Sequence, residues 1–160
     1  MRMKTLLIIA VLGLIGLAAL QAYVRLVPID PEQANRQPVM PEPGPGLWVI
    51  SSGAQAAVPV ASDPAAALAR FDGVIRAEPR SRVLAGRLED GQLTYVIRTA
   101  FWGFPDLVTL AARPDGDGTM ILIRSRQVIG RNDWGVNAAR VTRWIAALDL
   151  PLPPDRSASP

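Results

Sequence analysis

The chain contains neither cysteine nor histidine among its 160 residues. These two absences exclude disulfide bonds, thiolate nucleophiles, zinc sites of the Cys/His type and a Ser-His-Asp triad. Carboxylates and arginines remain as the groups that could do acid–base or electrostatic chemistry, and no two carboxylates stand at a spacing typical of a catalytic pair. We therefore predict no catalytic residue, no bound metal and no cofactor.

An excess of positive charge is also missing once the N-terminus is set aside. The chain has 17 basic and 14 acidic residues, and removing Arg2 and Lys4 leaves 15 against 14 for residues 5–160. Lys4 is the only lysine, so the sequence has no lysine-rich stripe that could follow a polyanion. A nearly neutral chain of this kind predicts no nucleic-acid partner.

One long apolar run is present, from Thr5 to Val24, which is 20 residues. This length spans a bilayer as a helix, so residues 1–25 are predicted to form a transmembrane anchor. A cleaved signal peptide is the alternative, but cutting after Ala22 would place Leu20 where a small residue is needed. The basic residues before the run predict a cytoplasmic N-terminus and an extracytoplasmic domain.

Residues 26–62 are predicted to be a proline-rich linker, because proline lacks an N–H and disfavours both helices and paired strands. Its prolines are Pro28, Pro31, Pro38, Pro41, Pro43, Pro45 and Pro59. The short apolar run Leu47–Ile50 fits an edge strand or a hydrophobic clip on the domain surface equally well, and the sequence leaves this open. At the other end, residues 151–160 are predicted to be a disordered tail.

Residues 63–150 are predicted to form one α+β domain. A helix should begin at Asp63-Pro64 and end near Glu78-Pro79, and a second helix should run from about Asp133 to Leu148. Four strands are predicted between them, at Ser81–Leu88, Gln92–Trp102, Leu107–Arg113 and Thr119–Ile129. Short turns join these strands, so we expect a four-stranded antiparallel meander with the C-terminal helix packed on one sheet face.

The stretch 124–140 gathers polar side chains between the last predicted strand and the last predicted helix. Its candidate binding residues are Arg124, Ser125, Arg126, Arg131, Asp133, Asn137 and Arg140. Strand alternation would point Arg124 and Arg126 to the same face as Met120 and Leu122, giving an apolar face with a cationic end.

Each of these residues also has a purely structural interpretation. Asp133 could cap the last helix, pair with Arg126 or Arg131, or do both. Gly135 suggests a close backbone approach. Asp106 is read as a turn residue, and the Asp115–Asp117 segment as a hairpin turn rather than a calcium loop.

Four motifs occur together in this order: F-W-G-F-P-D at 101–106, P-D-G-D-G at 114–118, R-S-R at 124–126 and G-R-N-D-W-G-V-N-A-A-R at 130–140. In this arrangement residues 63–148 resemble domain-of-unknown-function family 1499, and the anchor and linker are similar to those of bacterial members. The resemblance implies an uncharacterised bacterial membrane-anchored protein. It implies no activity, because the family has none to carry over.

Three hypotheses of function follow. The first is a non-enzymatic, membrane-anchored binding module in the periplasm, held by a single span in the bacterial inner membrane, with an envelope protein or lipid as partner. The second is a site for a small or lipidic anion on the arginine cluster, which a pocket containing Arg124, Arg126 and Arg140 would favour. The third is an enzyme with carboxylate and arginine chemistry, which a desolvated Asp133 beside an enclosed pocket would favour.

Overall fold

The computed structural model describes residues 2–36, 38 and 44–157. Pro41 and Pro43 of the predicted linker and residues 158–160 of the predicted tail lie outside this range. The helices are α1 (Arg2–Leu26), α2 (Pro31–Ala34), α3 (Pro64–Ala77), the 3-10 turn η1 (Leu88–Asp90) and α4 (Val136–Ala147). The strands are β1 (Gly46–Ile50), β2 (Gly53–Val60), β3 (Ser81–Arg87), β4 (Gln92–Arg98), β5 (Pro105–Asp115) and β6 (Gly118–Gln127).

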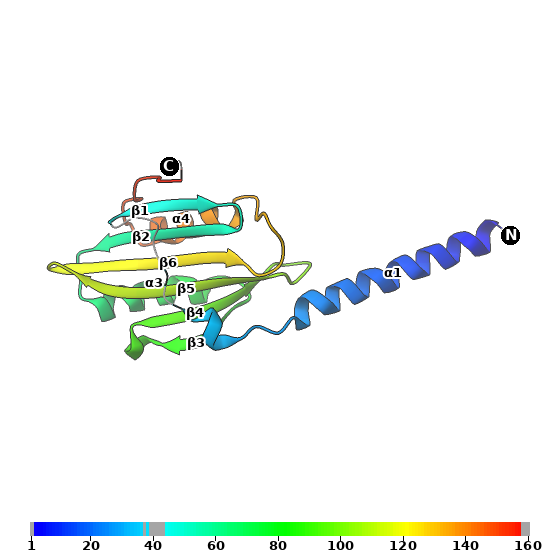
Figure 1. Cartoon of the computed structure of the whole chain (residues 1–160), viewed down its shortest axis with the longest axis horizontal. Helices are drawn as coiled ribbons and strands as arrows, with labels where there is room; N and C mark the ends of the chain where they lie inside the picture. Colours follow the sequence, from blue (N-terminus) through cyan, green and yellow to red (C-terminus); the bar gives the residue numbers. More distant parts are fainter. Residues whose placement is uncertain (1, 37, 39–43, 158–160) are drawn as a thin grey trace.

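The sheet has six antiparallel strands in the order β1-β2-β6-β5-β4-β3, so the predicted four-stranded meander is wrong (Figure 1). The two additional strands come from residues 46–60, within the segment predicted as a linker. Leu47–Ile50, whose role was left open, belongs to the edge strand β1. Pro59 is tolerated in β2 because β1 pairs only with residues 53–57, so the proline lies where that edge is free.

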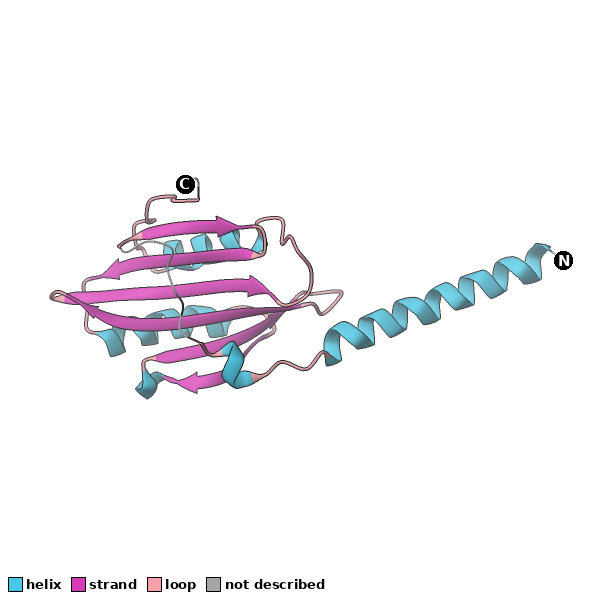
Figure 2. Cartoon of the chain, in the orientation of Figure 1, coloured by secondary structure: helices cyan, strands magenta, loops and turns pink. Residues whose placement is uncertain are grey.

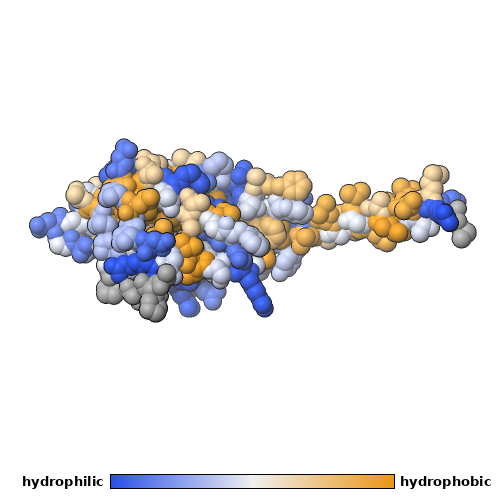
Figure 3. Space-filling view, turned by 90° about the horizontal axis from the view of Figure 1, so that it is seen from above, coloured by the Kyte–Doolittle hydropathy of each residue, from blue (hydrophilic) through white to orange (hydrophobic). Residues whose placement is uncertain are grey.

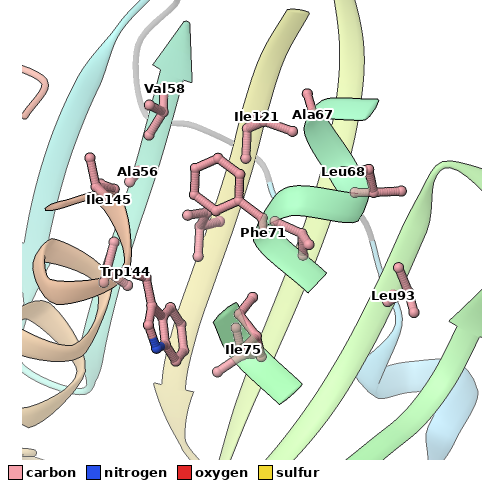
Figure 4. Packing of buried hydrophobic residues seen from close by; sticks show 14 of the residues in the cluster. Ala56, Val58, Ala67, Leu68, Phe71, Ile75, Leu93, Ile121, Trp144 and Ile145 are labelled. Atoms are coloured by element: carbon pink, nitrogen blue, oxygen red, sulfur yellow. The ribbon is translucent and has the colours of Figure 1, made fainter. Parts of the chain in front are cut away.

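Two helices, α3 and α4, cover one face of this sheet (Figure 2). The predicted start of α3 is confirmed, since the Asp63 side chain accepts a hydrogen bond from the Ala66 N–H at 3.0 Å. The core lies between these helices and the sheet, and Figure 4 shows Phe71 of α3 and Trp144 of α4 within it. Alternate residues of β2, β4, β5 and β6 supply the rest of that core, as period two requires.

The opposite face of the sheet is covered in part by the segment around α2. Thr109 donates to the carbonyl of Ala34 at 3.2 Å, and Thr94 donates to the side chain of Asn35 at 2.8 Å. Ala34 also packs with Val96 and Leu107 in a small apolar cluster. Residues just after the anchor are therefore bound to the folded domain.

The helix α1 projects from one end of the domain, and its surface is apolar along most of its length (Figures 1 and 3). It has 25 residues, with a mean hydropathy of 2.4 over its most apolar window, which is long and apolar enough to cross a membrane. Its C-terminal end contacts the β4–β5 loop: Gln21 and Arg25 both donate to the Phe101 carbonyl, at 3.1 and 3.2 Å. These bonds place the β4–β5 loop beside the end of the apolar helix.

The described part of the C-terminal tail differs from the predicted disorder. The Leu47 N–H donates to the Pro154 carbonyl, and the Arg156 N–H donates to the Leu47 carbonyl, both at 2.8 Å. Ser157 accepts from the Val49 N–H at 2.8 Å. The tail thus follows β1 and satisfies backbone groups that an edge strand would otherwise expose.

Candidate functional site

The predicted polar stretch is divided between the two faces of the sheet. Ser125 is fully buried on the side of the helices, between Ile123 and the start of α4. Arg124 and Arg126 are half-buried on the other side, which is the face of Met120 and Leu122, as strand alternation predicted. The lowered pKa of Arg126 comes first from burial and then from the charge of Arg124. Arg131 is exposed in the loop before α4.

On the helix side, three of the predicted residues form a buried polar network. Asn137 is its centre: its side-chain oxygen accepts from the Ser125 hydroxyl and, at 2.7 Å, from the Arg140 guanidinium. Arg140 also forms an ion pair with Asp106 at 3.0 Å, and each of the two side chains is only 7% exposed. Arg140 is thus held on the helix side of the sheet, opposite the face of Arg124 and Arg126.

That Asp106 belongs to this buried network was not predicted from the sequence, because Asp106 was interpreted there as a turn residue. It is the second residue of β5, two positions before Val108 and four before Leu110, which both lie in the core. Extending that period-two pattern by one step would have placed Asp106 on the core face. A carboxylate in such a position needs a cation or hydrogen-bond donors, and Arg140 supplies the cation.

The electrostatics of Asp106 follow from its position. Burial raises the pKa of this carboxyl, Arg140 lowers it, and the nearby charge of Asp133 raises it again, with a net upward shift. Desolvation is the largest of these effects, so the ion pair does not fully offset the cost of removing the carboxylate from water. Two carboxylates and one guanidinium therefore lie close together beneath the surface.

The N-cap residue of α4 is Gly135, and Asp133, two residues before it, accepts backbone N–H groups at the start of the helix. One of its oxygens accepts from the Gly135 N–H at 3.1 Å and the other from the Asn137 N–H at 2.9 Å. The predicted ion pair with Arg126 or Arg131 is not formed in the described ranges. The helix itself begins at Val136, later than predicted, because the chain first makes a tight turn.

The turn before α4 explains Gly135. Its φ is +78°, and a Cβ built there would meet nothing within 4 Å, so the glycine is needed for its backbone conformation and not for a close approach. Trp134 beside it also has a positive φ, of +55°. A bulky residue in this region is an outlier that costs of order 1–2 kcal/mol, and such outliers cluster at functional sites.

Trp134 belongs to a cleft of about 590 Å³ between the β4–β5 loop and residues 127–136. The aromatic side chains on its walls are Trp102, Phe104 and Trp134. Its polar lining includes Asp106, Asp133 and Gln127, and the Gln127 amide nitrogen is buried without a hydrogen-bond partner. This volume and this mixture of apolar walls with a few polar groups are typical of ligand sites.

No three carboxylates gather closely enough to hold a metal ion within the described part of the chain. Of the predicted candidates, Asp133 lines the cleft, and Ser125, Asn137 and Arg140 lie in the network that holds Asp106 at its floor. Arg124, Arg126 and Arg131 are not among its lining residues. The sequence does not reveal Trp102 and Trp134 as cleft walls, because no periodic pattern distinguishes an aromatic side chain of a loop in this role.

Comparison with protein families gives a match over most of the chain. The family model described as "Protein of unknown function (DUF1499)" matches residues 26–148. This range begins upstream of the resemblance seen in residues 63–148 and takes in α2, β1 and β2. No curated protein matches the chain.

Proposed function

Because the chain belongs to the DUF1499 family of proteins of unknown function, we propose its function from the geometry: it is a membrane-anchored module that binds an uncharged amphiphilic component of the bacterial envelope. The observation that carries this proposal is the cleft of about 590 Å³ with Trp102 and Trp134 on its walls. Trp134 is 88% exposed and held at a positive φ. An exposed indole that is held at a strained backbone conformation indicates a binding role for this side chain.

The lining of the cleft selects the class of ligand. Indole and phenyl rings offer apolar contact, and the unpaired amide of Gln127 offers a hydrogen-bond donor. Asp106 and Asp133 bring negative charge to the floor, and no arginine lines the cleft. An anion would therefore be repelled, whereas an uncharged molecule with apolar and hydrogen-bonding parts would fit.

Binding fits the two carboxylates better than acid–base catalysis does. Asp106 is engaged by Arg140, and both oxygens of Asp133 accept backbone N–H groups at the start of α4. Either carboxylate would have to break these contacts to take part in proton transfer. Their arrangement supports a rigid floor under the cleft.

Membrane anchoring is the second part of the proposal. The apolar helix α1 spans the inner membrane, Arg2 and Lys4 keep its N-terminus in the cytoplasm, and the domain lies in the periplasm. The contacts of Gln21 and Arg25 with the β4–β5 loop support retention of the helix, because cleavage after Ala22 would remove one of them. The cleft would then open close to the membrane surface, since the same loop forms one of its walls.

Native mass spectrometry of the full-length protein, purified in detergent and incubated with an envelope lipid extract, tests the cleft. The wild type should retain a ligand mass that Trp134→Gly and Trp102→Ala both lose. Leu88→Ala is the matched control for Trp102, since the two side chains are 39% and 37% exposed and Leu88 lies outside the cleft. Equal loss of the ligand in Leu88→Ala, or full retention in both tryptophan variants, would contradict the proposal.

Trp134→Gly also separates binding from folding. The substitution relieves a positive φ that costs about 1–2 kcal/mol, against an entropic cost of about 0.5–1 kcal/mol for the new glycine. Its melting temperature should therefore be equal to or slightly above that of the wild type, while binding falls. A clear drop in melting temperature would show that the indole serves the fold.

A further inference from the structure

A second pocket, of about 460 Å³, lies where α1 meets the domain. Four of its lining residues are arginines: Arg25 from the last turn of α1, Arg80 and Arg82 from the start of β3, and Arg98 from the end of β4. We call these four side chains the arginine pocket. Its remaining lining residues, Thr99, Ala100 and Gly103, come from the β4–β5 loop and carry no charge.

Antiparallel pairing brings these arginines together. Ser81 pairs with Ile97 and Arg82 pairs with Val96, so the start of β3 and the end of β4 lie side by side at the end of the sheet next to α1 (Figure 1). Arg98 then connects the domain to the anchor, since its guanidinium donates to the carbonyls of Val24, at 3.1 Å, and Gly103, at 2.9 Å.

Arg25 is held in position by the β4–β5 loop. It donates to the Phe101 carbonyl at 3.2 Å, and its aliphatic part lies against Gly103. A Cβ at Gly103 would come within 2.8 Å of the Arg25 side chain, and this glycine has a φ of +81°. The loop thus has room for the Arg25 stem only because residue 103 is a glycine.

The charges of the arginine pocket are not balanced by acidic groups. No carboxylate lines it, and none of the four arginines forms an ion pair within the described residues. Burial lowers the pKa of Arg98 first, and the charges of Arg82 and Arg25 lower it further. Four cations held close together without a counterion are repulsive, and a bound anion would relieve that repulsion.

The position of the pocket, at the end of the apolar helix α1, indicates the source of the anion. Arg25 is one residue from the end of the apolar helix, next to the exposed residues Tyr23 and Leu26. The β4–β5 loop beside it exposes Phe101 and Trp102, whose rings pack edge to face at 5.1 Å. Aromatic side chains with arginines at the end of a membrane span are typical of the headgroup region of a bilayer.

We propose that the arginine pocket binds the phosphate of an anionic phospholipid in the leaflet where α1 ends. The guanidinium groups of Arg80 and Arg82 contact the phosphate, Arg25 and Arg98 supply charge from the anchor side, and Phe101 lies among the acyl chains. The bound lipid fixes the domain against the membrane. This inference rests on the proposed anchoring by α1 and is independent of the ligand of the cleft.

Native mass spectrometry of the full-length protein in detergent micelles with equal amounts of phosphatidylglycerol and phosphatidylcholine tests the pocket. The wild type should retain phosphatidylglycerol in preference to phosphatidylcholine. The double variant Arg80→Gln/Arg82→Gln should lose this preference, by about fivefold for each arginine. Both side chains are exposed, so the fold should persist, which circular dichroism checks.

The matched control is Arg87→Gln/Arg113→Gln, which removes the same charge at the other end of the sheet and should keep the preference. If the control variant loses the preference for phosphatidylglycerol as fully as Arg80→Gln/Arg82→Gln does, the proposal is overturned, because net charge and not the pocket would then determine which lipid is bound. Trp134→Gly should also keep it, so a failed cleft and a failed arginine pocket give different results. Inorganic phosphate at millimolar concentration should not displace the lipid; if it does, the site is one for soluble phosphate and the lipid proposal is wrong.

Discussion

At the scale of single residues, the buried ion pair between Asp106 and Arg140 gives a prediction about stability. Both side chains are 7% exposed. Asp106→Asn leaves the Arg140 charge buried without a carboxylate, which should lower the free energy of unfolding by about 3–5 kcal/mol. Urea denaturation followed by circular dichroism measures this difference.

The control for Asp106→Asn is Arg87→Gln, which breaks the exposed pair between Arg87 and Glu89. Exposed pairs contribute about 0–1 kcal/mol, so this variant should be close to the wild type. An Asp106→Asn variant as stable as Arg87→Gln would show that Arg140 finds water or another partner.

Asp133 gives a second prediction at this scale, because its observed role is capping without an ion pair. Asparagine keeps one acceptor oxygen and turns its NH2 group toward the other N–H, so Asp133→Asn should lose one of these two hydrogen bonds, which lowers the free energy of unfolding by about 0.5–1.5 kcal/mol. Asp133→Ala removes both acceptors for the Gly135 and Asn137 N–H groups and should cost about 1–3 kcal/mol, more than Asp133→Asn. If the two variants are equally destabilised in a thermal melt, the negative charge matters more than the cap.

At the scale of elements, we expect β2 to be required for folding of the domain. It lies between β1 and β6, and Ala56, Val58 and Val60 belong to the core under the helices. A chain that starts at Asp63 would expose the whole edge of β6 and lose this part of the core. We therefore expect residues 63–160 to aggregate or stay unfolded.

Residues 27–160 should fold without the anchor, because they keep α2, β1 and β2. The two chains can be compared by circular dichroism and by cooperative thermal unfolding. A cooperative transition in residues 63–160 would show that β3–β6 with α3 and α4 form an independent unit, as the sequence had suggested.

The strands β1 and β2 also show which elements local sequence patterns do not predict. The periodicities that predict α3 and the strands β3–β6 are local, and each element has enough apolar residues to reveal them. β2 is Gly53-Ala-Gln-Ala-Ala-Val-Pro-Val60, in which alanine and proline have low strand propensity. It forms a strand because β6 and β1 pair with it on its two sides. The residues of β2 alone do not indicate this pairing.

At the scale of the whole molecule, the anchor makes a prediction about processing. Residues 5–24 should be retained, so the mature protein should contain this segment and remain in the membrane fraction after washing at high pH. Mass determination of the purified protein and cell fractionation measure this. A mature N-terminus near Tyr23, or full-length protein in the soluble fraction, would contradict it.

Much of this protein could be read from its sequence alone, because the signals are local. The apolar run of α1, the cap of α3 at Asp63, the alternation in β6 and the motifs of the family each lie within a few to a few tens of adjacent residues. The role of Asp133 at the start of the last helix was predicted only in part, because its side chain accepts backbone N–H groups there while the N-cap residue is Gly135. Each of these features depends on backbone preferences and periodicity, which neighbouring residues are enough to set.

Only the tertiary structure decided which distant residues meet. It divided the predicted arginine cluster between two faces, paired Asp106 with Arg140, and gathered Arg25, Arg80, Arg82 and Arg98 in the arginine pocket. The contact of Arg25 with Phe101 joins positions 76 residues apart. Strand order and the packing of α1 against the β4–β5 loop bring such residues together, and a single chain carries no local signal for either.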